Sequence, residues 1–144
     1  MTETFSLTVR TSKRSKSLVA VPFEIGETAE EPFVWVAWKL VVPDTVPKNL
    51  RHKLEGLSIG VSTFSGEWSI ANVGGGFRTM TVEQIARVPE RLKRALVESY
   101  ASERDRIGWP DFEMRHPTAA ARLRRAETLR RVYGDDYASA ACAG

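Results

Sequence analysis

One stretch decides the fold of this chain: Pro32-Phe33-Val34-Trp35-Val36-Ala37-Trp38-Lys39-Leu40-Val41-Val42. It is the longest apolar run in the sequence, and it is rich in β-branched and aromatic residues, which favour strands. Prolines stand at both of its ends, Pro32 and Pro43, and they favour a strand over a buried helix. The sequence therefore predicts a β-strand over residues 33–42.

This strand is apolar on both faces. Alternate side chains of a strand point to opposite sides of the sheet. One predicted face holds Phe33, Trp35, Ala37 and Val41, and the other holds Val34, Val36, Trp38, Leu40 and Val42. Because both sets are apolar, we expect a central strand that is covered on both sides. Trp35 and Trp38 are then expected in the core, and ligand stacking is their alternative role.

Two hairpins are predicted around the central strand. Phe5, Leu7 and Val9 alternate with polar residues, and a second strand runs over 18–25, beyond a polar loop. Residues 57–64 and 67–73 are expected to form another hairpin with the two-residue turn Ser65-Gly66. The sheet is therefore expected to hold five strands.

Helices are predicted from their start and stop signals. A short helix is expected between Pro47 and Gly56, with Leu50 and Leu54 on one side. Thr81 and Gln84 have the spacing of a capping box, and Met80 and Ile85 have the spacing of a hydrophobic staple.

The two main helices follow. Pro89 is expected to divide the capped helix, because it lacks the N–H that the helical ladder needs. Beyond it, Leu92, Leu96 and Tyr100 form an apolar stripe, and Gly108-Trp109-Pro110 is expected to end helical structure. The last helix is expected from Pro117 to Gly134.

These elements predict an α+β fold, a five-stranded mainly antiparallel sheet of two hairpins around a central strand, followed by two main helices. Residues 1–134 are expected to form a single α+β domain, and residues 135–144 a C-terminal tail. A chain of 144 residues suits one domain.

Composition narrows the setting. The only cysteine is Cys142, which excludes a disulfide framework and fits a cytoplasmic protein. No stretch is long and apolar enough for a membrane span, and no secretory signal is visible, so no membrane partner is expected. Arginine outnumbers lysine 15 to 6, which is typical of a G+C-rich bacterial genome.

Enzymatic signals are weak. The glycine run 74–76 lacks the pattern of a phosphate-binding loop. Asp111, Glu113 and His116 gather groups that bind metals or exchange protons, yet their spacing matches no defined ligand motif. We therefore predict no catalytic residue, no metal site and no cofactor, and an enzyme ranks third among the possible functions.

Basic residues give the strongest functional signal. The first hairpin loop carries Arg10, Lys13, Arg14 and Lys16 without an acid among them. The last helix carries Arg122, Arg124, Arg125, Arg130 and Arg131, opposed by Glu127 alone. A basic loop and an arginine-faced helix suit a phosphate backbone, so DNA or RNA is the expected partner. The alternatives are a solvated surface and an acidic protein partner.

The segment Thr128-Leu129-Arg130-Arg131-Val132-Tyr133, with the alanine-rich residues after it, resembles small proteins of unknown function from actinobacteria and their mobile elements. In some of these proteins a similar segment opens a C-terminal helix-turn-helix. The resemblance covers about the last tenth of the chain, and no turn and recognition helix follow Tyr137. It implies a DNA-binding role.

We therefore expect a non-enzymatic binding or regulatory protein that contacts a nucleic-acid backbone. The alternative is an interaction or assembly module, in which the second apolar face of the central strand is buried by another subunit, forming a homo- or hetero-oligomer.

Overall fold

Six antiparallel strands form one sheet in which every strand pairs with its neighbour in the sequence. The computed structural model describes residues 3–10, 17–29, 34–63, 65–72, 76–134 and 137. The strands are β1 (Thr4–Arg10), β2 (Leu18–Ala29), β3 (Val34–Val41), β4 (Leu57–Ser62), β5 (Trp68–Asn72) and β6 (Phe77–Thr79). The predicted α+β class is confirmed, with a sixth strand, β6, where a loop was expected.

The central strand contains a bulge that the sequence did not reveal. Trp35 lies opposite Val61 and Trp38 lies opposite Ile59, so β3 uses one more residue than β4 over this span. Directly opposed residues share a face of the sheet. Trp35 and Trp38 therefore point to the same face, and the predicted placement on opposite faces was wrong.

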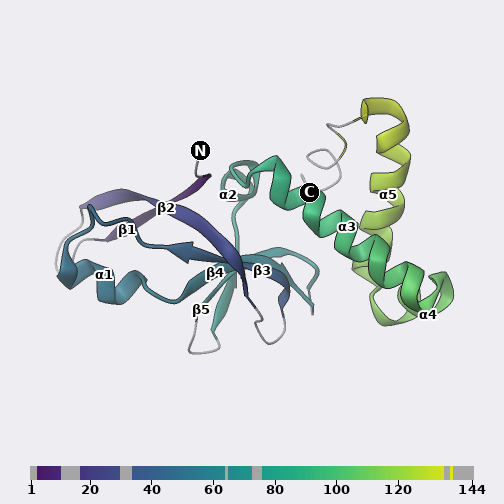
Figure 1. Cartoon of the computed structure of the whole chain (residues 1–144), viewed down its shortest axis with the longest axis horizontal. Coiled ribbons are helices and arrows are strands. Elements are labelled where there is room, and N and C mark those ends of the chain that lie inside the picture. Colours follow the sequence, from purple (N-terminus) through teal and green to yellow (C-terminus); the bar gives the residue numbers. More distant parts are fainter. Residues whose placement is uncertain are drawn as a thin grey trace.

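Gly60 makes this bulge possible. A Cβ atom at Gly60 would lie 2.5 Å from Cγ1 of Val34 and 2.8 Å from the carbonyl oxygen of Val36. Val36 itself has a φ of 36°, a conformation that a β-branched residue rarely adopts. A second bulge lies in β2, between Ile25 and Thr28, where this strand pairs with the edge of β3 that faces away from β4. It includes Gly26, whose Cβ position would lie 3.1 Å from Cγ2 of Val41. Bulges increase strand twist, and the sheet is curled into a half-barrel (Figure 1).

From Trp38 onward, only one face of β3 is covered. Trp38 and Leu40 are buried, whereas Lys39 is exposed and Val41 is 46% exposed. The expectation of a strand covered on both sides was therefore wrong for this half of β3. The buried face joins the main core, where the rings of Trp38 and Trp68 stack with their centres 6.3 Å apart.

Helices α1 (Lys48–Leu54), α2 (Val82–Ala86) and α3 (Glu90–Ile107) begin as the sequence predicted. Thr81 caps α2 through the predicted capping box with Gln84. Pro89 separates α2 from α3, and the predicted stripe of α3 is fully buried. Strand β4 ends at Ser62, and the N–H of Ser62 donates to the carbonyl oxygen of Glu67, so the β4–β5 connection is longer than the predicted two-residue turn Ser65-Gly66.

Two further helices follow α3 almost without interruption. Gly108, with a φ of 88°, ends α3, and α4 (Trp109–Arg115) starts at once, so the expected end of helical structure at Gly108-Trp109-Pro110 was wrong. Helix α5 (Pro117–Tyr133) starts at the predicted proline. Helices α3, α4 and α5 pack on one another beyond one end of the sheet, while α1 lies at the other end (Figure 1). None of the helices described is long and apolar enough to cross a membrane.

Candidate nucleic-acid interface

Helix α5 packs one side against α3 and α4 and turns the rest outward. Its buried side consists of small and branched apolar residues, Ala119, Ala120, Leu123 and Ala126. The five arginines predicted to bind a nucleic acid are distributed around the remaining surface. The structure gives them different surroundings, so they do not form a uniform basic face.

Arg124 is held by neighbours within the chain. Its guanidinium carbon lies 4.0 Å from the ring centre of Trp109, and its Nη2 donates to Oε2 of Glu113 at 3.1 Å. Arg104 of α3 lies over the same ring at 5.0 Å. Cations over a tryptophan ring are attracted by its negative face. Arg124 therefore joins α5 to α4 as well as carrying charge.

Arg104 also binds Glu127, the single acidic residue of α5. Its guanidinium is hydrogen-bonded to Glu127 and to Asp105. Burial opposes the charged form of Arg104, but these two carboxylates outweigh it and raise its pKa. Glu127 is therefore bound to α3 and does not neutralise the arginines of its own helix.

Arg130 holds the aromatic residue that follows the helix. Its Nη2 donates to the hydroxyl oxygen of Tyr137 at 2.7 Å, and its guanidinium lies 4.2 Å from the centre of that ring. Tyr137 is buried, although it belongs to the predicted tail, and it closes a crevice between α3 and α5 that is lined by Val97 and Leu123. Arg130 therefore has a packing role.

The remaining arginines of α5 are less engaged. Arg125 and Arg131 are exposed, and neither forms an ion pair with another described residue. Arg122 is half-buried, and its Nη1 is buried without a hydrogen-bond partner in the part of the chain that the structure describes. Among the five arginines of α5, Arg125 and Arg131 are therefore the two that are exposed and not engaged by another described residue.

The structure describes only part of the basic region of the first hairpin. Arg10 is exposed at the end of β1, whereas Lys13, Arg14 and Lys16 lie outside the described residues. The end of β1 lies near α1, at the opposite end of the molecule from α5 (Figure 1). The end of β1 and helix α5 thus belong to separate surfaces.

Asp111, Glu113 and His116 do not come together as a metal site. Glu113 is bonded to Arg124, and His116 packs edge-on against Trp35, with ring centres 4.9 Å apart. Among the described residues, no group of three His, Cys, Asp or Glu side chains could hold a metal ion.

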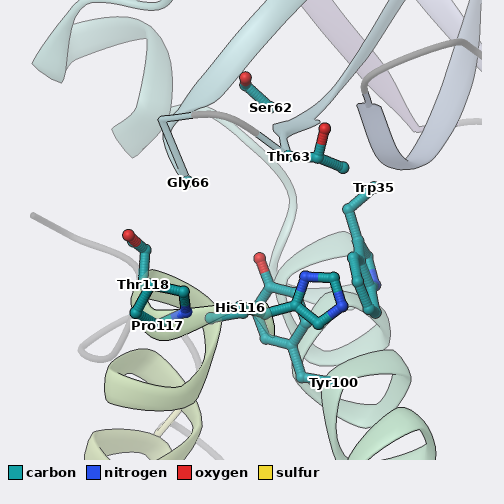
Figure 2. A pocket seen from close by; sticks show the side chains of 9 residues that line it. Trp35, Ser62, Thr63, Gly66, Tyr100, His116, Pro117 and Thr118 are labelled. Atoms are coloured by element: carbon teal, nitrogen blue, oxygen red, sulfur yellow. The ribbon is translucent and has the colours of Figure 1, made fainter. Parts of the chain in front are cut away.

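His116 instead lines a pocket of about 50 Å³ between the sheet and the helices. Figure 2 shows the hydroxyl of Tyr100 and the ring of His116 on one side, and Ser62, Thr63 and Gly66 of the β4–β5 turn on the other. The turn sits very close to α5, because a Cβ at Gly66 would lie 2.2 Å from Cγ2 of Thr118. The pocket is therefore a narrow gap in the joint between sheet and helices.

Sequence reasoning did not identify Trp109 and Tyr137 as the residues that engage the arginines. Because Gly108 and Pro110 flank Trp109, helical structure was expected to end there. Tyr137 follows the end of α5 and was assigned to the predicted tail. Which arginine meets which ring depends on how three helices pack, and no local pattern encodes that. Comparisons of the chain with protein-family models, curated proteins and solved structures found no match.

Proposed function

We propose that this chain is a non-enzymatic binding protein whose helix α5 contacts the phosphate backbone of a nucleic acid. One observation carries the proposal. Helix α5 holds five arginines and one glutamate, and that glutamate is bound to Arg104 of α3. Positive charge on α5 is therefore left without an acid on the same helix, and a phosphate backbone supplies the matching negative charge.

Arg125 and Arg131 are the proposed phosphate contacts. Both are exposed, and the guanidinium group suits phosphate oxygens. Arg122 flanks them, while Arg124 and Arg130 contribute mainly by holding Trp109 and Tyr137. Among the residues that the structure describes, Tyr133, at 57%, is the only strongly exposed aromatic side chain on α5. Duplex contact is therefore favoured over binding that stacks single-stranded bases on aromatic rings.

The basic residues that follow β1 are assigned a separate contact, because the end of β1 lies away from α5. The alternative of assembly through an apolar sheet face is less favoured. Leu18 and Val41 are exposed on the outer face, but Ser6, Thr8, Glu24 and Lys39 are interspersed with them. A subunit interface normally needs a more continuous apolar patch.

The test is a salt titration of binding to a fluorescent DNA duplex. Each phosphate contact gives a slope of about −0.9 in the log–log plot of affinity against salt. Arg125→Gln with Arg131→Gln should therefore flatten the slope by up to about 1.8 and weaken binding similarly on unrelated sequences.

The matched control is Lys48→Gln with Lys53→Gln on α1, which removes two exposed charges at the other end of the molecule. This control should leave the slope unchanged. Equal losses in both double variants would overturn the assignment to α5. Absence of binding to DNA and RNA at low salt would overturn the proposed function.

A further inference from the structure

Strand β1 is the outer strand at one margin of the sheet. It pairs with β2 over its whole length of seven residues, and no other described strand pairs with it. The opposite margin is β6, which has only three residues. The sheet therefore offers one long edge at which a further strand could be added.

A single hydrogen bond shows which backbone groups of β1 are free. The N–H of Ile25 donates to the carbonyl oxygen of Glu3 at 3.0 Å, and these two residues continue the register in which Thr4 lies opposite Glu24. In an antiparallel pair, hydrogen-bonded and non-hydrogen-bonded positions alternate. Phe5, Leu7 and Val9 therefore bond to β2, while the N–H and C=O groups of Thr4, Ser6, Thr8 and Arg10 point to the open side.

This edge lacks the features by which proteins block unwanted pairing. Such edges usually carry proline, lysine, inward-pointing charges or a bulge, or they are very short. The segment TFSLTVR has neither proline nor lysine, its pairing with β2 is unbroken, and its inward side chains Phe5 and Leu7 are buried and apolar. An edge of this kind is suited to accept another strand.

We propose that β1 pairs antiparallel with β1 of a second copy of this chain, with Leu7 opposite Leu7 across a two-fold axis. This register opposes Ser6 to Thr8 and Thr4 to Arg10, so all the outward-pointing backbone groups meet. It also places the apolar residues Phe5, Leu7 and Val9 of both copies on one continuous face.

The occupant is a second copy because the strand is complementary to itself. Arg10 is its only charged residue, and it faces the neutral Thr4, so no like charges meet across the axis. The hydroxyl residues Ser6 and Thr8 face each other, a favourable cross-strand pair. Val9 is half-buried and its β2 neighbour Val19 is 42% exposed, so this end of the core gains cover from the partner's strand.

The first test measures self-association by sedimentation velocity at chain concentrations up to about 1 mM, at which about 4 kcal/mol of affinity suffices to form a dimer. Thr8→Pro removes an N–H that points to the open side, so the β1–β2 ladder stays complete. We expect its dissociation constant to rise at least about tenfold, because each copy loses a donor. Thr8→Ser, which keeps both the N–H and the hydroxyl that faces Ser6, should dimerise as the parent does.

The second test reads the register and does not depend on tolerance of proline. Thr4 faces Glu24 within its own chain and, in the proposed dimer, Arg10 of the other. Thr4→Lys should raise the melting temperature of the monomer and weaken the dimer roughly threefold or more, and Thr4→Glu should do the reverse. A parent chain that stays monomeric at every concentration would overturn the proposal. So would a Thr4 variant that changes the melting temperature of the monomer and the affinity of the dimer in the same direction. The DNA titration reports on α5, so the two proposals can fail independently.

Discussion

Trp35 joins the sheet to the helices through one hydrogen bond: its indole N–H donates to the hydroxyl oxygen of Ser99 on α3 at 2.8 Å. The same ring contacts Tyr100 edge-on, with ring centres 5.2 Å apart. Trp35 is only half-buried, yet it connects β3 to α3 and to His116 at the start of α5. Four measurements test this and the other local interactions.

A double-mutant cycle of Trp35→Phe and Ser99→Ala should give a coupling energy of about 0.5–1.5 kcal/mol, the usual net value of such a hydrogen bond. Phenylalanine keeps most of the ring packing and removes the N–H. Urea unfolding measures the free energies. Ser102→Ala is the control, because Ser102 is exposed on the same helix and gains the same helix propensity. Additive effects of the two changes would contradict the bond.

Gly60→Ala should destabilise the chain by about 1–3 kcal/mol, because the added methyl group has no room beside the bulge of β3. Gly76→Ala is the comparison. Its Cβ would lie 3.3 Å from Nδ2 of Asn72, a side chain in an exposed region. Thermal unfolding followed by circular dichroism should show a much larger loss for Gly60→Ala, and equal losses would contradict the tight approach of β3 and β4.

Thr81→Ala should cost about 0.5–2 kcal/mol, since it removes the acceptor for the N–H of Gln84. Thr81→Ser keeps that acceptor and should lie within about 0.5 kcal/mol of the parent. Thr79→Ala, in β6, should cost less than Thr81→Ala. The measurement is the denaturation midpoint, and the reverse order would place the start of α2 two residues earlier.

Lowering the pH should release one ion pair of α3. A hydrogen bond from Arg106 lowers the pKa of Glu103, with burial opposing it. A carboxyl whose folded pKa is lowered stabilises the fold above its unfolded pKa, and this contribution is lost as the pH falls through the folded pKa. Arg106→Gln should therefore raise the Glu103 midpoint in a carbon-detected NMR titration. An unchanged midpoint would mean that the pair is not formed in solution.

Much of the fold could be predicted because local signals encode it. The capping box at Thr81, the break at Pro89 and the helix start at Pro117 each depend on residues within one turn. The hairpin strands follow from alternation, which is also local. These elements were confirmed within a few residues.

The errors concern interactions between distant segments. The bulge at Val36 requires Gly60 on the next strand, and no residue pattern within β3 itself predicts it. Only Gly108 separates α3 from α4. Gly108 and Pro110 had been interpreted as the end of helical structure. The contacts of Arg124 and Arg130 with aromatic rings were not predicted either, because those rings come near the arginines only when the helices are packed.

The extra residue at Val36 determines how the sheet is connected to helices α3 and α5. A chain one residue shorter at this point would retain every strand, but Trp35 would turn away from Ser99 and His116. Sheet and helices would still share one hydrophobic core, but they would lose this hydrogen-bonded anchor between them. Chain length at a single point in β3 therefore determines whether the indole of Trp35 reaches the helices at all.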